Sequence, residues 1–143
     1  MRSLLDINVL IALLDQDHAF HTRAHAWWRK AQPQWASCPL TENGVVRIMA
    51  SVNYSKARQF TVADIVNLLQ TFAAGTEHTF WPDSVSILDA KRFEHGRILS
   101  SKSLADIYLL ALAMEKGGRL VSFDQGIAAS AVARATSRNL LIL

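Results

Sequence analysis

The chain has 143 residues, of which 50% are hydrophobic and 19% are charged, with 15 Lys and Arg against 12 Asp and Glu. This length suits one domain with its own core, and the composition excludes an intrinsically disordered chain. A net charge of +3 is compatible with a polyanionic partner but is far below that of a dedicated nucleic-acid arm. We therefore expect residues 1–143 to form a single domain.

The compartment can be predicted from what the sequence lacks. Its one cysteine, Cys38, cannot form an internal disulfide. The apolar stretch at 3–14 is interrupted by Asp6 and Asn8, which is not typical of a secretory signal. No apolar run reaches the roughly 20 residues that a membrane span requires. We therefore expect a cytoplasmic protein with no membrane partner.

The chain opens with alternating strand and helix patterns. Residues 3–6 indicate a buried strand that ends at its aspartate, and a helix is expected over 8–14. A second helix is expected over 18–31, with Phe20 on its apolar stripe. Residues 34–38, which lie between two prolines, leave room for one short strand.

The middle of the chain continues this alternation. Thr41 is expected to cap a helix that runs to about residue 52. A capping-box pattern opens a helix over 61–74, which a glycine ends. Residues 77–81 indicate a strand, and residues 83–102 predict only one or two short helices.

The C-terminal third predicts two more strands. A capping pattern opens a long apolar helix over 103–116, and Gly117 ends it. A strand is expected over 119–123, a helix over 125–134 and a last strand over 139–143. The five short strands alternate with helices, which predicts an α/β fold with a parallel sheet and helices on both faces.

Two acidic residues follow predicted strands, where open parallel sheets bind their ligands. Asp6 ends the first strand, and Asp124 follows the strand over 119–123. Each also precedes a predicted helix, so the simpler interpretation of either residue alone is a helix N-cap.

Asp106 is harder to explain as a cap. It is the only charged residue between Leu104 and Met114, in a helix that is apolar on all sides. Such a helix is buried, so its first-turn carboxylate is buried or nearly so. Burying an unpaired carboxylate is costly, and the helix N-terminus compensates for it only in part. A bound cation would compensate for it more fully.

Glu42 shows the same placement on another helix. Together with Val45, Val46 and Met49 it follows the i, i+3, i+4, i+7 pattern of one helix face, although a first-turn acid also complements the helix dipole. If the four carboxylates converge, their hard oxygen ligands select Mg²⁺ or Mn²⁺. The chemistry typical of such a site is metal-assisted phosphoryl transfer.

Four stretches of the chain resemble the signature stretches of PIN domains, and they are most similar to those of VapC ribonuclease toxins. They are LLDINVL at 4–10, TENGVVRI at 41–48, LADIYLLALA at 104–113 and LVSFD at 120–124. The resemblance covers essentially the whole chain in the family's order. It implies a three-layer α/β/α sandwich with a central parallel sheet of about five strands.

The resemblance also implies an active site. The four acids would surround one or two Mg²⁺ or Mn²⁺ ions, and two polar residues would hydrogen-bond to them. The acids are Asp6, Glu42, Asp106 and Asp124, and the polar residues are Asn8 and Ser122. Two departures are mild, since Ala105 and Ser122 stand where the family commonly has threonine.

The function that this resemblance implies is that of a toxin in a VapBC-type toxin–antitoxin pair. Such a protein is a metal-dependent endoribonuclease that cleaves structured RNA, such as a tRNA or rRNA loop, by metal-activated water. The resemblance further implies a homodimer, and an antitoxin whose C-terminal segment enters the acidic cleft.

Three alternatives compete with this interpretation. The spacing of His18, His21 and His25 on one helix face could indicate zinc, but a solvated polar face is the simpler explanation. A haloacid-dehalogenase-like or receiver-like phosphate domain also places an aspartate after its first strand, yet Asn8 stands where the former needs its second aspartate. A PIN-like binding module without catalysis is the third alternative.

Overall fold

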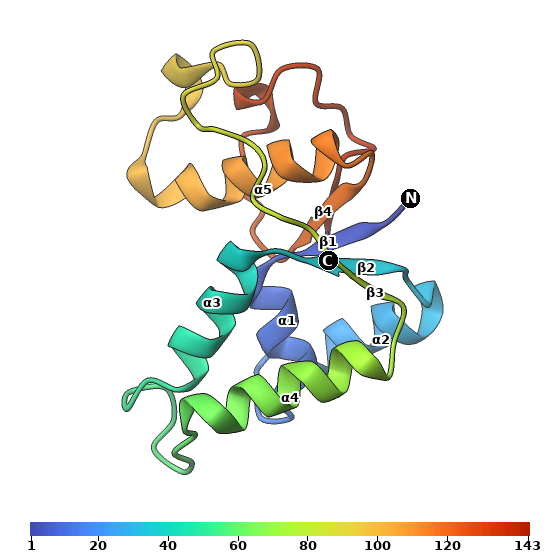
Figure 1. Cartoon of the computed structure of the whole chain (residues 1–143), viewed down its shortest axis with the longest axis vertical. Helices are drawn as coiled ribbons and strands as arrows, with labels where there is room; N and C mark the ends of the chain where they lie inside the picture. The colour runs from blue at the N-terminus through green and yellow to red at the C-terminus, as the bar shows by residue number, and fades with distance from the viewer.

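A parallel sheet of five strands lies at the centre of the computed structural model, which describes all 143 residues (Figure 1). The strands are β1 (Ser3–Leu5), β2 (Trp35–Ser37), β3 (His78–Phe80), β4 (Arg119–Ser122) and β5 (Leu140–Ile142). Their order is β3-β2-β1-β4-β5. The chain builds outward from β1 in one direction and then returns to build β4 and β5 on the other side. The sheet therefore has a topological switch point between β1 and β4, which is where such sheets bind ligands.

Helices cover both faces of this sheet. One face is covered by α1 (Ile7–Leu14), α2 (His21–Ala31), α3 (Pro39–Met49) and α4 (Val62–Ala74). The long apolar helix α5 (Leu104–Glu115) covers the other face (Figure 1). The predicted three-layer α/β/α architecture with about five parallel strands is confirmed.

Alternation along the strands divides the interior into two cores. In β1, Leu4 packs in the core beneath α5, and Leu5 packs in the core beneath α1 to α4. In β4, Leu120 and Val121 divide in the same way. Successive side chains of a strand point to opposite faces, so each buried strand contributes to both cores.

Three helix starts show how local chemistry sets the boundaries. The predicted capping box at Thr61 and Asp64 is present at the start of α4. Helix α2 begins at His21 rather than at residue 18, so Phe20 precedes the helix and is 42% exposed. Cys38, not Thr41, is the N-cap of α3, because Pro39 occupies the first helical position, where its missing N–H costs nothing.

The predicted helix over residues 125–134 is wrong. Only Ala129–Ala131 form a turn of 3₁₀ helix there. The Glu94 amide donates to the Ala131 carbonyl at 2.9 Å, and the Ala133 amide donates to the Arg92 carbonyl at 2.8 Å. Pairing with residues 92–94 therefore takes backbone groups that a helix would have used.

The segment between β3 and α5 is mostly irregular, as the sequence predicts. It contains two short 3₁₀ helices, at His95–Arg97 and Ser101–Ser103.

No helix of the molecule combines the length and apolar character needed to cross a membrane.

Candidate functional site

Asp6 lies at the carboxyl end of β1, at the switch point of the sheet. Its side chain is buried, with 4% of its surface exposed. One carboxylate oxygen, Oδ1, accepts the Ile7 amide at 2.7 Å, so Asp6 is also the N-cap of α1. Ser122 Oγ donates to the other oxygen, Oδ2, at 2.6 Å. Burial raises the pKa of Asp6 despite these two hydrogen bonds, and the charge of Asp124 adds to the effect.

Ser122 and Asn8 connect the end of β4 to the start of α1. The Ser122 hydroxyl accepts the Asp124 amide at 3.0 Å and Asn8 Nδ2 at 3.3 Å. Asn8 Oδ1 accepts the Phe123 amide at 3.3 Å. These contacts fix the backbone on both sides of the aspartates: Ser122 hydrogen-bonds Asp6 directly, whereas Asn8 bonds Ser122 and the Phe123 amide rather than an acidic side chain.

Asp106 reaches the same place from the other face of the sheet. It lies in the first turn of α5 and is half-buried. Burial is the main cause that raises the pKa of Asp106 to about 7. The charge of Asp6 acts in the same direction, as do the charge of Asp124 and a hydrogen bond with that residue. Each of these causes favours the neutral carboxyl. Asp6, Asp106 and Asp124, which we call the aspartate cluster, therefore act on one another although they belong to three separate elements.

Asp124 is the most exposed member of the aspartate cluster. It begins the loop after β4, and its Oδ1 accepts the Gly126 amide at 2.8 Å. A turn closed by an aspartate side chain is common, and this one holds Asp124 on the solvent side of the aspartate cluster.

Glu42 lies apart from the aspartate cluster. It is in the first turn of α3, as predicted, but its Oε1 accepts the Ser37 hydroxyl at 2.6 Å. Ser37 Oγ is also 2.7 Å from His78 Nε2. Because the one hydroxyl proton goes to Glu42, the imidazole Nε2 must be the donor in this second contact. Glu42 is not among the charges that raise the pKa of Asp106.

The group of Ser37, Glu42 and His78 borders a cavity of about 340 Å³ between α3, α4 and the sheet. Ser37 is fully buried at the end of β2. Burial lowers the pKa of His78, and the charge of Arg2 acts in the same direction against that of Glu42. Sequence reasoning missed Ser37 and His78; the only available signal was the presence of polar residues inside short predicted strands.

The aspartate cluster suits a hard divalent cation by the chemistry of its donors. None of the three ion pairs in the protein involves a member of the cluster. Carboxylate oxygens are the ligands that Mg²⁺ and Mn²⁺ prefer. No three His, Cys, Asp or Glu side chains are arranged to hold one metal ion in the present side-chain positions. Binding an ion therefore requires the carboxylates to rotate toward it.

The three histidines at positions 18, 21 and 25 do not form a metal site. His21 Nδ1 is 2.8 Å from the Ala12 carbonyl, and His25 Nε2 is 2.9 Å from the Leu13 carbonyl. These carbonyls belong to the last turn of α1, which has no following turn to bond them. The expectation of a solvated histidine face is wrong for His21 and His25, because both are half-buried and cap α1.

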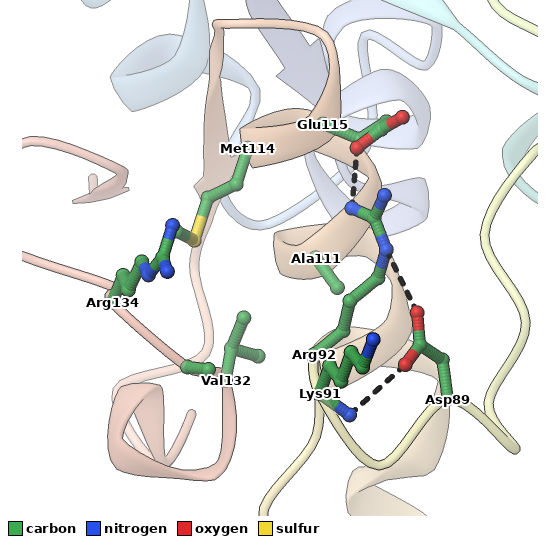
Figure 2. Close-up of a pocket in the computed structure, with 9 residues that line it drawn as sticks. Asp89, Lys91, Arg92, Ala111, Met114, Glu115, Val132 and Arg134 are labelled. Atoms are coloured by element: carbon green, nitrogen blue, oxygen red, sulfur yellow. Dashed lines mark hydrogen bonds and ion pairs between the residues drawn. The ribbon is translucent and has the colours of Figure 1, made fainter.

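A second cavity, of about 490 Å³, is lined by the C-terminal half of α5, at Ala111, Met114 and Glu115 (Figure 2). Arg92 lies on its wall and forms ion pairs with both Asp89 and Glu115. Its cation is therefore already neutralised, and the cavity does not extend the aspartate cluster.

The chain is similar in sequence to known proteins. A model of the PIN domain matches residues 3–133. Ribonuclease VapC44 of Mycobacterium tuberculosis is 46% identical over 144 residues, covering 100% of both chains. Ribonuclease VapC39 of the same organism is 38% identical over 135 residues, which are 93% of this chain and 96% of the relative.

A solved structure shows the same fold at low sequence identity. It is the crystal structure of VapBC2 from Rickettsia felis bound to a DNA fragment from their promoter. The TM-score is 0.55 at 14% identity, with 100% of this chain and 98% of the other chain covered.

Proposed function

The chain belongs to the VapC branch of the PIN-domain family, and from this premise we propose that it is a metal-dependent endoribonuclease, the toxin of a toxin–antitoxin pair. One observation carries the proposal. Asp6, Asp106 and Asp124 meet at the switch point of the sheet, and no ion pair of the protein compensates them. A cluster of this kind costs stability unless it binds a cation.

The residues have separate roles in this proposal. Asp6 and Asp106 would bind Mg²⁺ or Mn²⁺ most directly, because they are the buried and half-buried members of the cluster. Asp124, at the mouth, would complete the site on the solvent side. Ser122 and Asn8 would hold Asp6 and the loop after β4 in place, through the hydrogen bonds described above.

A bound divalent ion supplies an activated water and offsets the charge of the phosphate. The chain's own residues determine where this can happen. The cluster lies at the switch point between β1 and β4, so the scissile phosphate would approach at the exposed Asp124. We expect hydrolysis to leave 5′-phosphate and 3′-hydroxyl ends.

Glu42 would join the site through water or by a rotation of its side chain. Its hydrogen bond with Ser37 holds the carboxylate near the end of β2. We therefore assign Glu42 a place at the edge of the acidic site, one step further from the ion than Asp6 and Asp106.

The expected partners follow from the same aspartate cluster. The substrate would be structured RNA, such as a tRNA or rRNA loop, in the cytoplasm. A VapB-like antitoxin would neutralise the toxin by placing a basic side chain among the aspartates, where a guanidinium makes charge-assisted hydrogen bonds. We also propose that the toxin is a homodimer.

The test is cleavage of total RNA with EDTA and then with added Mg²⁺ or Mn²⁺. Wild type should be inactive in EDTA and active with metal. Asp6→Asn should be inactive throughout, whereas Asp17→Asn, which removes an exposed charge outside the cluster, should behave as wild type. Cleavage that persists in EDTA and leaves 2′,3′-cyclic phosphates would contradict metal-dependent hydrolysis. Absence of cleavage under every condition would favour a binding module.

A further inference from the structure

We propose that Phe20, Phe123 and Arg23 form a stacking platform for one unpaired RNA base at the rim of the aspartate cluster. The inference rests on the proposed function, since it describes how the same site would hold its RNA. Its evidence is separate, because none of these three side chains belongs to the acidic site.

The three side chains are packed on one another. The ring centroids of Phe20 and Phe123 are 4.8 Å apart. The guanidinium carbon of Arg23 lies 5.9 Å from the Phe20 centroid and 5.7 Å from the Phe123 centroid. The imidazole of His18 is 5.9 Å from the Phe20 ring. The result is a surface of two rings and a cation, held together by cation–π contacts.

Phe20 and Arg23 open this surface to solvent, whereas Phe123 is half-buried. Phe20 is 42% exposed, and Arg23 is exposed as well. Phe20 precedes α2 without capping it through its side chain, so helix formation does not explain a phenylalanine there. Arg23 takes part in none of the three ion pairs. The platform therefore presents uncompensated positive charge together with exposed aromatic surface.

The backbone ties the platform to the acidic site. Phe123 lies between Ser122, which donates to Asp6, and Asp124 of the cluster. Its amide donates to Asn8 Oδ1 at 3.3 Å, which fixes the strand end that carries the ring. The α-carbons of Phe123 and Asp124 are only ~3.8 Å apart. A nucleotide whose phosphate is at Asp124 would thus have the platform beside it.

The chemistry of the platform fits an unpaired base better than a protein side chain. Proteins recognise single-stranded RNA by stacking its bases on aromatic rings and on arginine guanidinium planes. Arg23 can also lie near a phosphate, because it forms no ion pair with an acidic side chain of the protein. We therefore assign the platform to RNA, whose phosphates complement the positive charge of Arg23. A second copy of the chain or a protein partner that covers the platform instead is an outcome that the test distinguishes.

The test measures RNA binding by the full chain without cleavage. The probe is a 3′-labelled single-stranded RNA 12-mer of mixed sequence, followed by fluorescence anisotropy in EDTA. All variants carry Asp106→Asn, which keeps the probe intact. Phe20→Ala should bind about tenfold more weakly, the scale of one lost stacking contact. Its control is Val62→Ala, which trims another exposed apolar side chain, 60% exposed, at the start of α4.

Arg23→Ala has a control on its own helix. Arg29 is also exposed and forms no ion pair, and it lies on a different face of α2. Removing either arginine changes the net charge equally, so their non-specific losses should match. Arg23→Ala should weaken binding several-fold more than Arg29→Ala. Circular dichroism spectra and melting curves establish that each variant is folded.

A base-removal series identifies the stacked nucleotide. Abasic substitutions are placed one at a time along the 12-mer. At one position the loss of the base should weaken binding about tenfold with Phe20 present and have little effect with Phe20→Ala. Such coupling is not expected if Phe20 only supports the fold.

Four outcomes separate the two proposals. If wild type cleaves RNA but Phe20→Ala and Arg23→Ala bind like their controls, the platform is overturned and the proposed function stands. If the coupling is found but wild type cleaves no RNA with Mn²⁺, the platform stands and the function fails. If the Asp106→Asn protein that carries no further change binds no RNA, the platform is overturned. It is also overturned if Phe20→Ala changes the oligomeric state and leaves RNA binding unchanged.

Discussion

The two polar groups beside the carboxyl end of β1 are built in opposite ways. On the β4 side, burial and the neighbouring aspartates raise the pKa of Asp6 and that of Asp106, the latter to about 7. On the β2 side, the carboxylate of Glu42 accepts a hydrogen bond from Ser37, which in turn contacts His78. The first group is strained by unpaired charge, and the second is satisfied by hydrogen bonds.

This difference indicates which of the two polar groups lacks a ligand. All three ion pairs of the protein lie elsewhere, at Arg58 and at Arg92. The strain on the β4 side is therefore not relieved within the chain. Active sites commonly keep such strain, because arrangements that improve stability often cost function. The satisfied side is suited to holding a carboxylate in position rather than to binding an ion directly.

The largest expected effect comes from removing a charge on the strained side. Asp106→Asn should reduce RNA cleavage with Mn²⁺ at least about 100-fold, because even outer partners of a metal site typically contribute 10- to 100-fold. Rates are measured by single-turnover cleavage of one RNA substrate. Asp17→Asn is the control for a lost surface charge. An Asp106→Asn variant with near-normal activity would remove Asp106 from the catalytic site.

Metal should distinguish the two sides through stability. Mn²⁺ at about 100 times its Kd should stabilise wild type by about 2.7 kcal/mol, because the ion binds the native state. The measurement is urea unfolding in EDTA and in Mn²⁺. Asp106→Asn should lose most of this gain, whereas Ser37→Ala should keep it. Equal gains for wild type and Asp106→Asn would mean that the ion binds elsewhere.

On the satisfied side, Ser37→Ala removes the donor that holds Glu42. We expect kcat to fall about tenfold with KM nearly unchanged, the scale reported for lost partners of metal ligands. Ser130→Ala is the control, since this serine is exposed. An unchanged kcat in a folded Ser37→Ala protein would show that catalysis does not depend on the position of Glu42.

Part of this contrast could be predicted from the sequence. Asp106 is conspicuous because it is the only charge in an apolar helix, and burial of that helix then requires a partner for the carboxylate. The strand ends at Asp6 and Asp124 follow from the βαβ pattern and the rule that ligands bind at carboxyl ends. Local pattern and one general rule thus predict where these three residues lie, whereas their role at a metal ion stays a prediction.

The rest depends on contacts between distant segments. Ser37 meets His78 only because β2 and β3 are neighbours in a particular register. His21 and His25 cap α1 because the chain turns back along it, which helical spacing alone cannot show. The expected helix at 125–134 fails for the same reason, since residues 92–94 take its backbone partners.

The smallest expected effect is a pH dependence of stability on the strained side. The folded pKa of Asp106 is about 7, above the ordinary value of 3.8. Between these two values the folded state holds more protons than the unfolded chain, so the free energy of unfolding falls as pH rises. Burial gives Asp6 the same sign.

The size of this effect is limited by solvent, because Asp106 is only half-buried. In EDTA we expect wild type to lose about 1 kcal/mol of stability between about pH 4 and pH 7, and Asp106→Asn to lose less and to be more stable near pH 7. Asp15 offers an internal contrast: the Tyr54 hydroxyl, the Asp17 amide and Arg58 outweigh burial and lower its pKa. The stabilisation that ionised Asp15 provides is therefore lost in acid, as the pH falls through its lowered pKa. Urea unfolding at several pH values measures both trends. If Asp106→Asn is instead less stable than wild type at pH 7 in EDTA, the carboxylate is a helix cap, and the repulsion assigned to the aspartate cluster is wrong.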